Sequence, residues 1–351
     1  MRIALEATAL ALSSGGLTRY TAELSLALAR TFPLDEICLI SDQQFEMPAG
    51  APPNLVRGGG PRNAAERRWW LWGIAREMSR LHADVFHGPD FAVPYIGRRP
   101  SVLTLHDLSP WMDPRWHHAA DRVRRRTPLL LELGLATMVI TPGEEVRKQA
   151  IERFRLRPDR VVAVPEAAAP WFRPVEPRPA EVPYFLYVGT LEPRKNLPVL
   201  IEGWHEARRH QRVDLVLAGR RRTDFPELPA EAGLHVLGEV PDQELPALYS
   251  GALALVYPSF YEGFGLPVIE AMQCGASVIA SHAVAAAAGG AAVYADTPVE
   301  LAAAMRAVAE RPDWNAELRA RSLERARGYS WERTARLTHE VYEEARKRFA
   351  S

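Results

Sequence analysis

The stretch that decides the fold runs from Tyr257 to Met272 and reads YPSFYEGFGLPVIEAM. Its first residues complete an apolar run typical of a buried strand. A helix is predicted to begin near Pro267, because proline is well tolerated in the first helical turn. Between the two, Gly263 and Gly265 let the backbone come close to a ligand, and free amides at a helix start favour an anion. The stretch therefore predicts a strand, a ligand-binding loop and a helix in succession.

Two carboxylates accompany this loop. Glu262 lies within it, and Glu270 lies about one turn into the predicted helix. Two carboxylates that face one cleft could accept hydrogen bonds from two hydroxyl-bearing parts of one ligand. The structural alternative is a glycine-rich turn with two glutamates on the surface, and spacing alone leaves both open.

Outward from this stretch, strand-like apolar runs alternate with helical segments along the whole chain. The runs of the first half are Arg2–Ala7, Glu36–Ser41, Asp84–His87, Ser101–His106 and Thr137–Thr141. Those of the second half are Phe185–Thr190, Asp214–Gly219, His235–Val240, Ala252–Pro258, Ala276–Ser281 and Ala291–Ala295. Helical periodicity is seen between them, as in Thr18–Arg30, Glu144–Phe154, Leu197–Arg209 and Pro298–Ala309. Short buried strands separated by helices predict α/β domains with doubly wound parallel sheets.

The 351 residues suggest two such domains. A proline-rich stretch in the middle predicts an extended linker, and its prolines are Pro165, Pro170, Pro174, Pro177, Pro179 and Pro183. We therefore expect one domain over residues 1–170, a second over 171–330, and a last helix over 331–351 that crosses back to the first. Ligands of doubly wound sheets bind beyond the carboxyl ends of the strands. Two facing sheets are thus expected to line an interdomain cleft.

Composition excludes several classes of protein. The 43 Lys and Arg residues balance 43 Asp and Glu residues, so we expect no general nucleic-acid binding, which needs a surplus of positive charge. Cys38 and Cys274 lie far apart, which excludes a disulfide scaffold and a cysteine-built zinc site. The first residues are too polar for a signal peptide, and no apolar run is long enough to span a bilayer. The expected location is cytoplasmic, or peripheral on the inner membrane face.

The segment from Glu262 to Glu270 resembles the Glu-x7-Glu motif of retaining glycosyltransferases with the GT-B fold, notably those of family four. The resemblance includes the intervening Gly-Phe-Gly-Leu-Pro. It extends to other segments of the chain, which are Gly15–Tyr20, Asp84–Pro89, Thr104–Leu108 and Tyr187–Asn196. It implies a GT-B fold of two Rossmann-like domains and a hexosyltransferase activity (class EC 2.4) that uses a nucleotide diphosphate sugar.

The resemblance also implies roles for residues of the second domain. Glu270 corresponds to the glutamate that binds the ribose hydroxyls of the nucleotide. Glu262 corresponds to the group that holds the donor sugar, together with the backbone amides of Gly263, Phe264 and Gly265. Lys195 and Arg194 would neutralise the diphosphate. Considered alone, however, Arg194 and Lys195 could equally form the solvated start of a helix.

In the first domain, the resemblance implies that Gly15 and Gly16 approach the donor phosphate. His106 would lie beneath the reacting sugar at the end of its strand. Each feature has a structural alternative, because glycine loops are common in βαβ folds and His106 could be a core histidine satisfied by Asp107 or by the backbone. The joint occurrence of the motifs in order favours the functional interpretation.

The chemistry of the reaction fits this set of residues. Cleavage of a sugar–diphosphate bond develops negative charge on the departing phosphate, which fixed cations and helix N-termini stabilise. No metal or other cofactor is then required, and the chain contains no Asp-x-Asp pair. The configuration is retained in family four, and a front-face displacement is the mechanism commonly proposed there.

The chain departs from the family pattern at two places. Thr190 stands where many relatives carry an arginine, which leaves Arg194 and Lys195 as the phosphate cations of this loop. After Ser281, residues 282–286 read HAVAA and lack the usual Leu-Pro-Glu segment. The second departure puts the local loop conformation in doubt.

Basic residues mixed with tryptophan form two further clusters, Arg67–Trp72 and Arg122–Arg126. They could meet anionic lipid headgroups and a lipid-linked acceptor. Alternatively, helices bury the tryptophans and solvate the arginines. A third basic run, Arg220–Arg222, could lie near the nucleotide, although a solvated loop is the simpler interpretation.

The sequence thus predicts a retaining glycosyltransferase that moves a hexose to a glycan or lipid-linked acceptor in surface polysaccharide synthesis. Mannose from GDP-mannose is the specific prediction. The alternatives are another GT-B activity, such as a sugar phosphorylase or a nucleotide-sugar epimerase, and a non-catalytic homologue that binds a nucleotide sugar.

Overall fold

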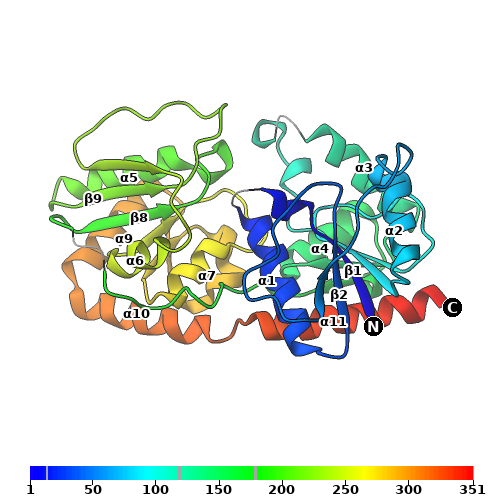
Figure 1. Cartoon of the computed structure of the whole chain (residues 1–351). Coiled ribbons are helices and arrows are strands. Elements are labelled where there is room, and N and C mark those ends of the chain that lie inside the picture. Colours follow the sequence, from blue (N-terminus) through cyan, green and yellow to red (C-terminus); the bar gives the residue numbers. More distant parts are fainter. Residues whose placement is uncertain (13–14, 118–119, 178–179, 351) are drawn as a thin grey trace. The chain divides into compact units, whose positions relative to one another are not determined.

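The computed structural model describes residues 1–12, 15–117, 120–177 and 180–350. They form two compact units. Unit 1 comprises Met1–Glu166 and Ser330–Ser351, and unit 2 comprises Ala167–Tyr329. Each unit has its own parallel sheet covered by helices (Figure 1).

The sheet of unit 1 has seven strands among the described residues, all parallel, in the spatial order β3-β2-β1-β4-β5-β6-β7. The strands are β1 (Arg2–Glu6), β2 (Glu36–Ile40), β3 (Leu55–Arg57), β4 (Val85–Gly88), β5 (Ser101–Thr104), β6 (Met138–Thr141) and β7 (Val161–Ala163). The α-helices of this unit are α1 (Gly16–Thr31), α2 (Ile74–Arg80), α3 (Asp121–Glu132), α4 (Glu144–Phe154) and α11 (Trp331–Ala350).

The sheet of unit 2 has six strands in its described part, again all parallel, in the order β10-β9-β8-β11-β12-β13. The strands are β8 (Tyr184–Val188), β9 (Asp214–Ala218), β10 (Leu234–Gly238), β11 (Leu255–Tyr257), β12 (Val278–Ala280) and β13 (Ala292–Tyr294). The α-helices are α5 (Leu197–Arg208), α6 (Leu245–Gly251), α7 (Leu266–Gln273), α8 (Ala285–Ala288), α9 (Pro298–Glu310) and α10 (Pro312–Ala326). The two doubly wound sheets confirm the predicted α/β fold class.

Two short strands were not predicted from the sequence. β3 and β7 each have three residues and lie at opposite edges of the unit 1 sheet. Each has only one fully buried residue among its three. The central strands, by contrast, are buried along nearly their whole length, which is why their apolar runs are visible in the sequence.

A close approach of two loops shapes the carboxyl edge of the unit 2 sheet. Gly219 follows β9 with a φ of +148°, and a Cβ atom at this position would lie 2.0 Å from the carbonyl oxygen of Gly189. Gly189 in turn follows β8. Only glycine permits this contact, so the loops after β8 and β9 lie directly against each other.

The proline-rich segment has no regular secondary structure in its described part, and Pro179 lies outside the described residues. Much of its first half is nevertheless buried, because Ala168, Ala169 and Phe172 belong to the core of unit 2. Gln273 of α7 donates hydrogen bonds to the carbonyl oxygens of Ala169 and Phe172, at 3.1 and 2.7 Å. This part of the segment is thus held by unit 2 rather than solvated.

The last helix, α11, packs against α1 within unit 1 (Figure 1). Tyr342 of α11 places its hydroxyl 2.7 Å from His87 Nδ1 in β4, and both side chains are fully buried. Thr334 of α11 donates a hydrogen bond to the carbonyl oxygen of Pro165 at 2.7 Å. Residues from the end of the chain therefore complete the core that the first residues begin. Within the described residues, no helix combines the length and apolarity that crossing a bilayer requires.

Candidate active site

The densest group of charged side chains in unit 2 lies beyond the carboxyl ends of β8 and β11. The loop after β8 forms a 3₁₀ turn, Pro193–Lys195, that carries Arg194 and Lys195. The loop after β11 carries Glu262. Because β8 and β11 are neighbouring parallel strands, the two loops meet at the same edge of the sheet.

Glu262 forms ion pairs with both cations of the other loop. Lys195 Nζ donates to Oε1 at 2.6 Å, and Arg194 Nη1 donates to Oε2 at 3.1 Å. The three side chains are only 8–10% exposed. The alternative in which Arg194 and Lys195 form a solvated helix start is therefore wrong.

A second carboxylate extends this group. Glu192 accepts a hydrogen bond from Arg194 Nη2 at 2.9 Å and another from Arg222 Nη1 at 3.0 Å. Arg222 also pairs with Asp224. The interpretation of residues 220–222 as a solvated loop is thus wrong for Arg222, which joins the network through Glu192. Cations and carboxylates alternate along the network, so their charges nearly cancel.

Burial and charge act in opposite directions on the two central groups. Burial alone would raise the pKa of Glu262, but Arg194 and Lys195 outweigh it and hold the pKa at about 2. This pKa lies below the ordinary value of 4.5, so the stability that ionised Glu262 contributes is complete above about pH 4.5 and is lost as the pH falls toward 2. Burial lowers the pKa of Lys195, and Glu262 opposes that shift.

Tyr257, the last residue of β11, supports Lys195 from a second side. Its hydroxyl accepts a hydrogen bond from Lys195 Nζ at 2.8 Å, and Nζ lies 5.0 Å from the centre of the ring. Tyr187 of β8 stacks on Tyr257, with the ring centres 6.0 Å apart. Lys195 is therefore held in one position by the side chains of Tyr257 and Glu262.

The two glutamates of the Glu-x7-Glu segment occupy different environments. Glu270 is fully buried in α7 and accepts a hydrogen bond from the hydroxyl of Tyr249 in α6 at 3.1 Å. Glu262 is 8% exposed and faces the cations. The alternative of two surface glutamates is therefore wrong. Gly265, with a φ of +95°, is the N-cap of α7, so the backbone rather than a capping side chain lies at this helix start. Gly263 and Phe264 are half-buried in the same loop.

In unit 1, the predicted residues lie at the start of α1 and after β5. Gly15, with a φ of +129°, is the exposed N-cap of α1, which begins at Gly16. His106 follows β5, and its Nδ1 lies 3.0 Å from Glu166 Oε1 while its Nε2 lies 2.7 Å from the carbonyl oxygen of Pro89. Of the alternative in which Asp107 or the backbone satisfies His106, the backbone part is confirmed by Pro89, whereas Asp107 accepts hydrogen bonds from Ser109 instead.

The two tryptophan–arginine clusters fit neither simple alternative. Trp69 is buried, whereas Trp72 is 40% exposed. Arg126 is 9% exposed, and its guanidinium lies 5.2 Å from the centre of the Trp70 ring, so the two clusters touch. The cluster residues that remain exposed are Arg67, Arg68, Trp72, Arg122 and Arg125.

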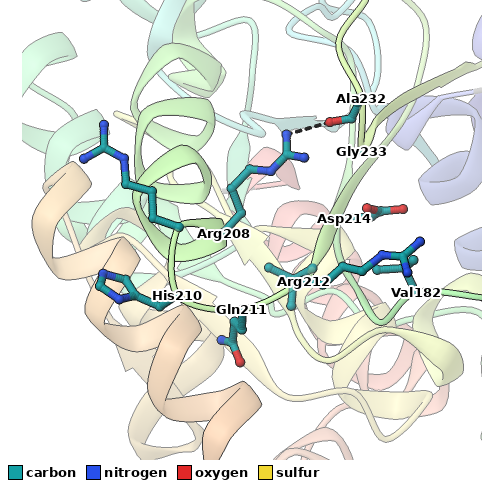
Figure 2. A pocket seen from close by; sticks show the side chains of 10 residues that line it. Val182, Arg208, His210, Gln211, Arg212, Asp214, Ala232 and Gly233 are labelled. Carbon is teal, nitrogen blue, oxygen red and sulfur yellow. Dashed lines mark hydrogen bonds between the residues drawn. The ribbon is translucent and has the colours of Figure 1, made fainter.

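The structure also contains cavities away from these groups. A cavity of about 520 Å³ in unit 2 is lined by Arg208, Arg212 and Asp214 among other residues (Figure 2). It lies at the amino ends of β8, β9 and β10, the edge opposite to the one that binds ligands in doubly wound sheets. A cavity of about 740 Å³ in unit 1 lies among α3, α4 and the loop after β5. Within the described part of the chain, no three His, Cys, Asp or Glu side chains come close enough together to hold a metal ion.

Sequence reasoning missed three contributors to these groups. Glu192 and Tyr257 lie inside motifs that were recognised, but nothing in their spacing indicated a role. Glu166 lies in the proline-rich segment, 60 residues from His106, where no local signal points to it. Such long-range partners emerge only from the fold.

Comparisons with known proteins show the family of the chain. Residues 14–169 match the family described as Glycosyltransferase Family 4, and residues 171–327 match Glycosyl transferases group 1. An O-antigen chain mannosyltransferase B of Escherichia coli is 34% identical over 282 residues, which are 74% of this chain and 74% of that protein.

Two solved structures share the fold at low identity. A sucrose-phosphate synthase from Thermosynechococcus elongatus has a TM-score of 0.73 at 20% identity, over 98% of each chain. Anabaena Alr3699/HepE, solved in complex with UDP and glucose, has a TM-score of 0.72 at 18% identity, over 98% of this chain and 100% of that one. The fold is therefore GT-B, and the chain belongs to glycosyltransferase family 4, the glycosyl transferases group 1 enzymes.

Proposed function

We propose that the chain is a retaining mannosyltransferase that moves mannose from GDP-mannose to a glycan or lipid-linked acceptor in surface polysaccharide synthesis. The observation that carries the proposal is the buried pair of cations, Arg194 and Lys195, gathered on Glu262 at the carboxyl edge of the unit 2 sheet. The choice of mannose is supported by the relative named O-antigen chain mannosyltransferase B.

Unit 2 would hold the donor. Arg194 and Lys195 would take the diphosphate, because they are preorganised cations in a largely water-excluded position. Glu262 and the amides of Gly263, Phe264 and Gly265 would hold the sugar hydroxyls, and Glu270 would bind the ribose. In unit 1, the backbone at Gly15 and Gly16 would contribute amides to a donor phosphate, because a helix start favours an anion.

Transfer would proceed with all atoms accounted for and without a metal. The bond between the anomeric carbon and the phosphate oxygen breaks, and its electron pair stays on the diphosphate. The acceptor hydroxyl forms a new bond to the anomeric carbon on the same face. Its proton passes to the departing phosphate. Lys195 and Arg194 stabilise the charge that develops on that phosphate.

The donor can be tested by thermal unfolding with UDP, GDP, ADP, CMP, dTDP and their common sugars. A ligand at a hundred times its dissociation constant adds about 2.7 kcal/mol to the free energy of unfolding. We expect GDP and GDP-mannose to give the largest shifts, and mannose 1-phosphate and GMP to give small ones because each lacks part of the diphosphate. A larger shift with UDP-glucose than with GDP-mannose would contradict the proposed donor.

The acceptor side of the proposal rests on unit 1. The exposed residues Arg67, Arg68, Trp72, Arg122 and Arg125 combine positive charge with an aromatic ring. Arginine and tryptophan together favour the interface of an anionic membrane, where a lipid-linked acceptor would lie. We therefore include peripheral membrane contact through this surface in the proposal.

Membrane contact is expected to depend on the charge of this surface. Each basic residue near an anionic membrane contributes about 1 kcal/mol, so the double variant Arg122→Glu/Arg125→Glu should bind anionic vesicles at least tenfold more weakly at low salt. Co-sedimentation with vesicles measures the effect. The matched control is Arg209→Glu/Arg212→Glu in unit 2, which makes the same charge change at exposed positions. Equal loss in both variants, or no binding by the natural chain, would refute contact through the unit 1 surface.

A further inference from the structure

Both ring nitrogens of His106 are already engaged by groups of the protein. Nε2 lies 2.7 Å from the carbonyl oxygen of Pro89, and Nδ1 lies 3.0 Å from Glu166 Oε1. A carbonyl oxygen only accepts hydrogen bonds, so Nε2 carries a proton and donates it. A carboxylate also only accepts, so Nδ1 donates as well whenever Glu166 is ionised. The contacts thus select the doubly protonated imidazolium form of His106.

The surroundings of the ring hold it in place. Tyr20 of α1 meets the ring edge-on, with the centres 4.6 Å apart and the planes at 88°. The ring centre of Phe91, in the loop after β4, lies 6.3 Å from that of His106. The side chain of His106 is 20% exposed and that of Glu166 is 5% exposed. The ring therefore has little freedom to turn and release either nitrogen.

Glu166 is itself firmly placed. It ends the first of the two segments that make up unit 1, and the carbonyl oxygen of the preceding Pro165 accepts a hydrogen bond from Thr334 of α11. Val164 and Ala167 on either side are buried. The hydrogen bond from α11 thus fixes the backbone next to Glu166, and this places the Glu166 carboxylate against His106.

Other titratable groups face His106 from the elements packed around it. They are Asp90 after β4, His87 in β4, and Arg126 of α3, which acts on Asp90. Burial alone would lower the pKa of His106, but the hydrogen bond and charge of Glu166, with smaller contributions from the Pro89 carbonyl and Asp90, raise it overall. His87 is different, because burial lowers its pKa to about 3 and keeps it neutral. Glu166 is therefore the main group that raises the pKa of His106.

We propose that Glu166 is a positioning residue that holds His106 as an imidazolium in a fixed orientation, so that His106 acts in transfer as a fixed cation and not as a general base. The inference rests on the proposed function and adds a residue to it. An imidazolium whose two N–H groups are both donated to the protein has no free lone pair with which to take the acceptor's proton. Its positive charge instead favours an anionic substrate group at the carboxyl edge of the unit 1 sheet.

The test compares Glu166→Gln with the natural chain in two measurements. Selective ¹⁵N-histidine labelling follows the ring nitrogens of His106 by NMR as the pH is varied, with His106→Gln used for assignment. Without the carboxylate, the midpoint of the His106 titration should fall by about one to two pH units. In the pH profile of mannosyl transfer, the pH above which the rate declines should fall by a similar amount. At pH 7.5, kcat should therefore be lower than in the natural chain, while the KM for donor stays unchanged.

Two controls separate this role from a purely structural one. Glu166→Asp keeps the carboxylate and should bring the pH above which transfer declines (the alkaline limit) back toward that of the natural chain. Asp35→Asn removes the carboxylate from another histidine pair of unit 1, in which Asp35 Oδ2 lies 2.7 Å from His339 Nε2, and should leave the limit unchanged. A merely structural role would lower the unfolding temperature without moving the pH limit.

The outcomes also distinguish the inference from the function on which it rests. Absence of mannosyl transfer by the natural chain would refute the proposed function, while the NMR titration would still decide whether Glu166 sets the charge of His106. Normal transfer by the natural chain, together with an unchanged titration midpoint or pH limit in Glu166→Gln, would overturn the inference.

Discussion

Replacing Lys195 with methionine is expected to lower kcat for transfer by about a hundredfold to a thousandfold, the usual loss when one preorganised group that stabilises developing negative charge is removed. Methionine preserves most of the buried stem but lacks the ammonium that donates to Glu262 at 2.6 Å and to Tyr257 at 2.8 Å. Arg194 stays paired with Glu262, so the fold should survive. The measurement is nucleotide release at saturating donor, beside an unfolding curve.

The matched control is Lys148→Met, which changes one of the other lysines at an exposed position of α4. This variant should transfer at the natural rate. A loss of kcat smaller than about threefold in Lys195→Met would show that Lys195 does not stabilise the transition state, because even one ordinary hydrogen bond to a charged group contributes more than that.

The second large effect is expected from Glu262→Gln, which should lower kcat/KM for transfer by about a hundredfold or more and yet leave the affinity for GDP equal or higher. Glu262 forms ion pairs with the same two cations that the diphosphate would need. Glutamine keeps the shape but leaves Arg194 and Lys195 with more uncompensated positive charge. Turnover of the sugar should therefore fall without any loss of affinity for the leaving nucleotide.

Titration calorimetry with GDP, at two salt concentrations, measures the binding half of this prediction. Glu231→Gln is the control, because it removes a carboxylate from a more exposed cluster of the same unit, with His205 and Arg208. If GDP affinity fell in Glu262→Gln as far as transfer did, Glu262 would serve to organise the cations rather than to hold the sugar.

Much of the fold was predictable because its signals are local. The bounds of α4 agree with the predicted Glu144–Phe154, and those of α11 agree with the predicted 331–351 to within one residue, since amphipathic periodicity covers each helix from end to end. The central strands were visible as apolar runs for the same reason. β3 and β7, which each fully bury only one of their three residues, were missed.

The charged groups were predictable only in part. Arg194, Lys195 and Glu262 were identified from their motifs, but the direct pairing of Lys195 with Glu262 spans 67 residues of sequence. Burial of Glu270 and the link of Arg222 to Glu192 also depend on how strands and loops are brought together. Sequence motifs indicate which residues carry chemistry, whereas the partners that set their charge are fixed by tertiary structure.

The return of α11 to unit 1 has a consequence for synthesis of the chain on the ribosome. Unit 2 is contiguous and can fold as soon as Tyr329 has emerged. Unit 1 needs α11 as well, although its first strand is made long before that helix. Until then His87 lacks the Tyr342 hydroxyl, and the apolar face of α1 has no cover from α11. The nascent first half therefore remains open until α11 has emerged from the ribosome.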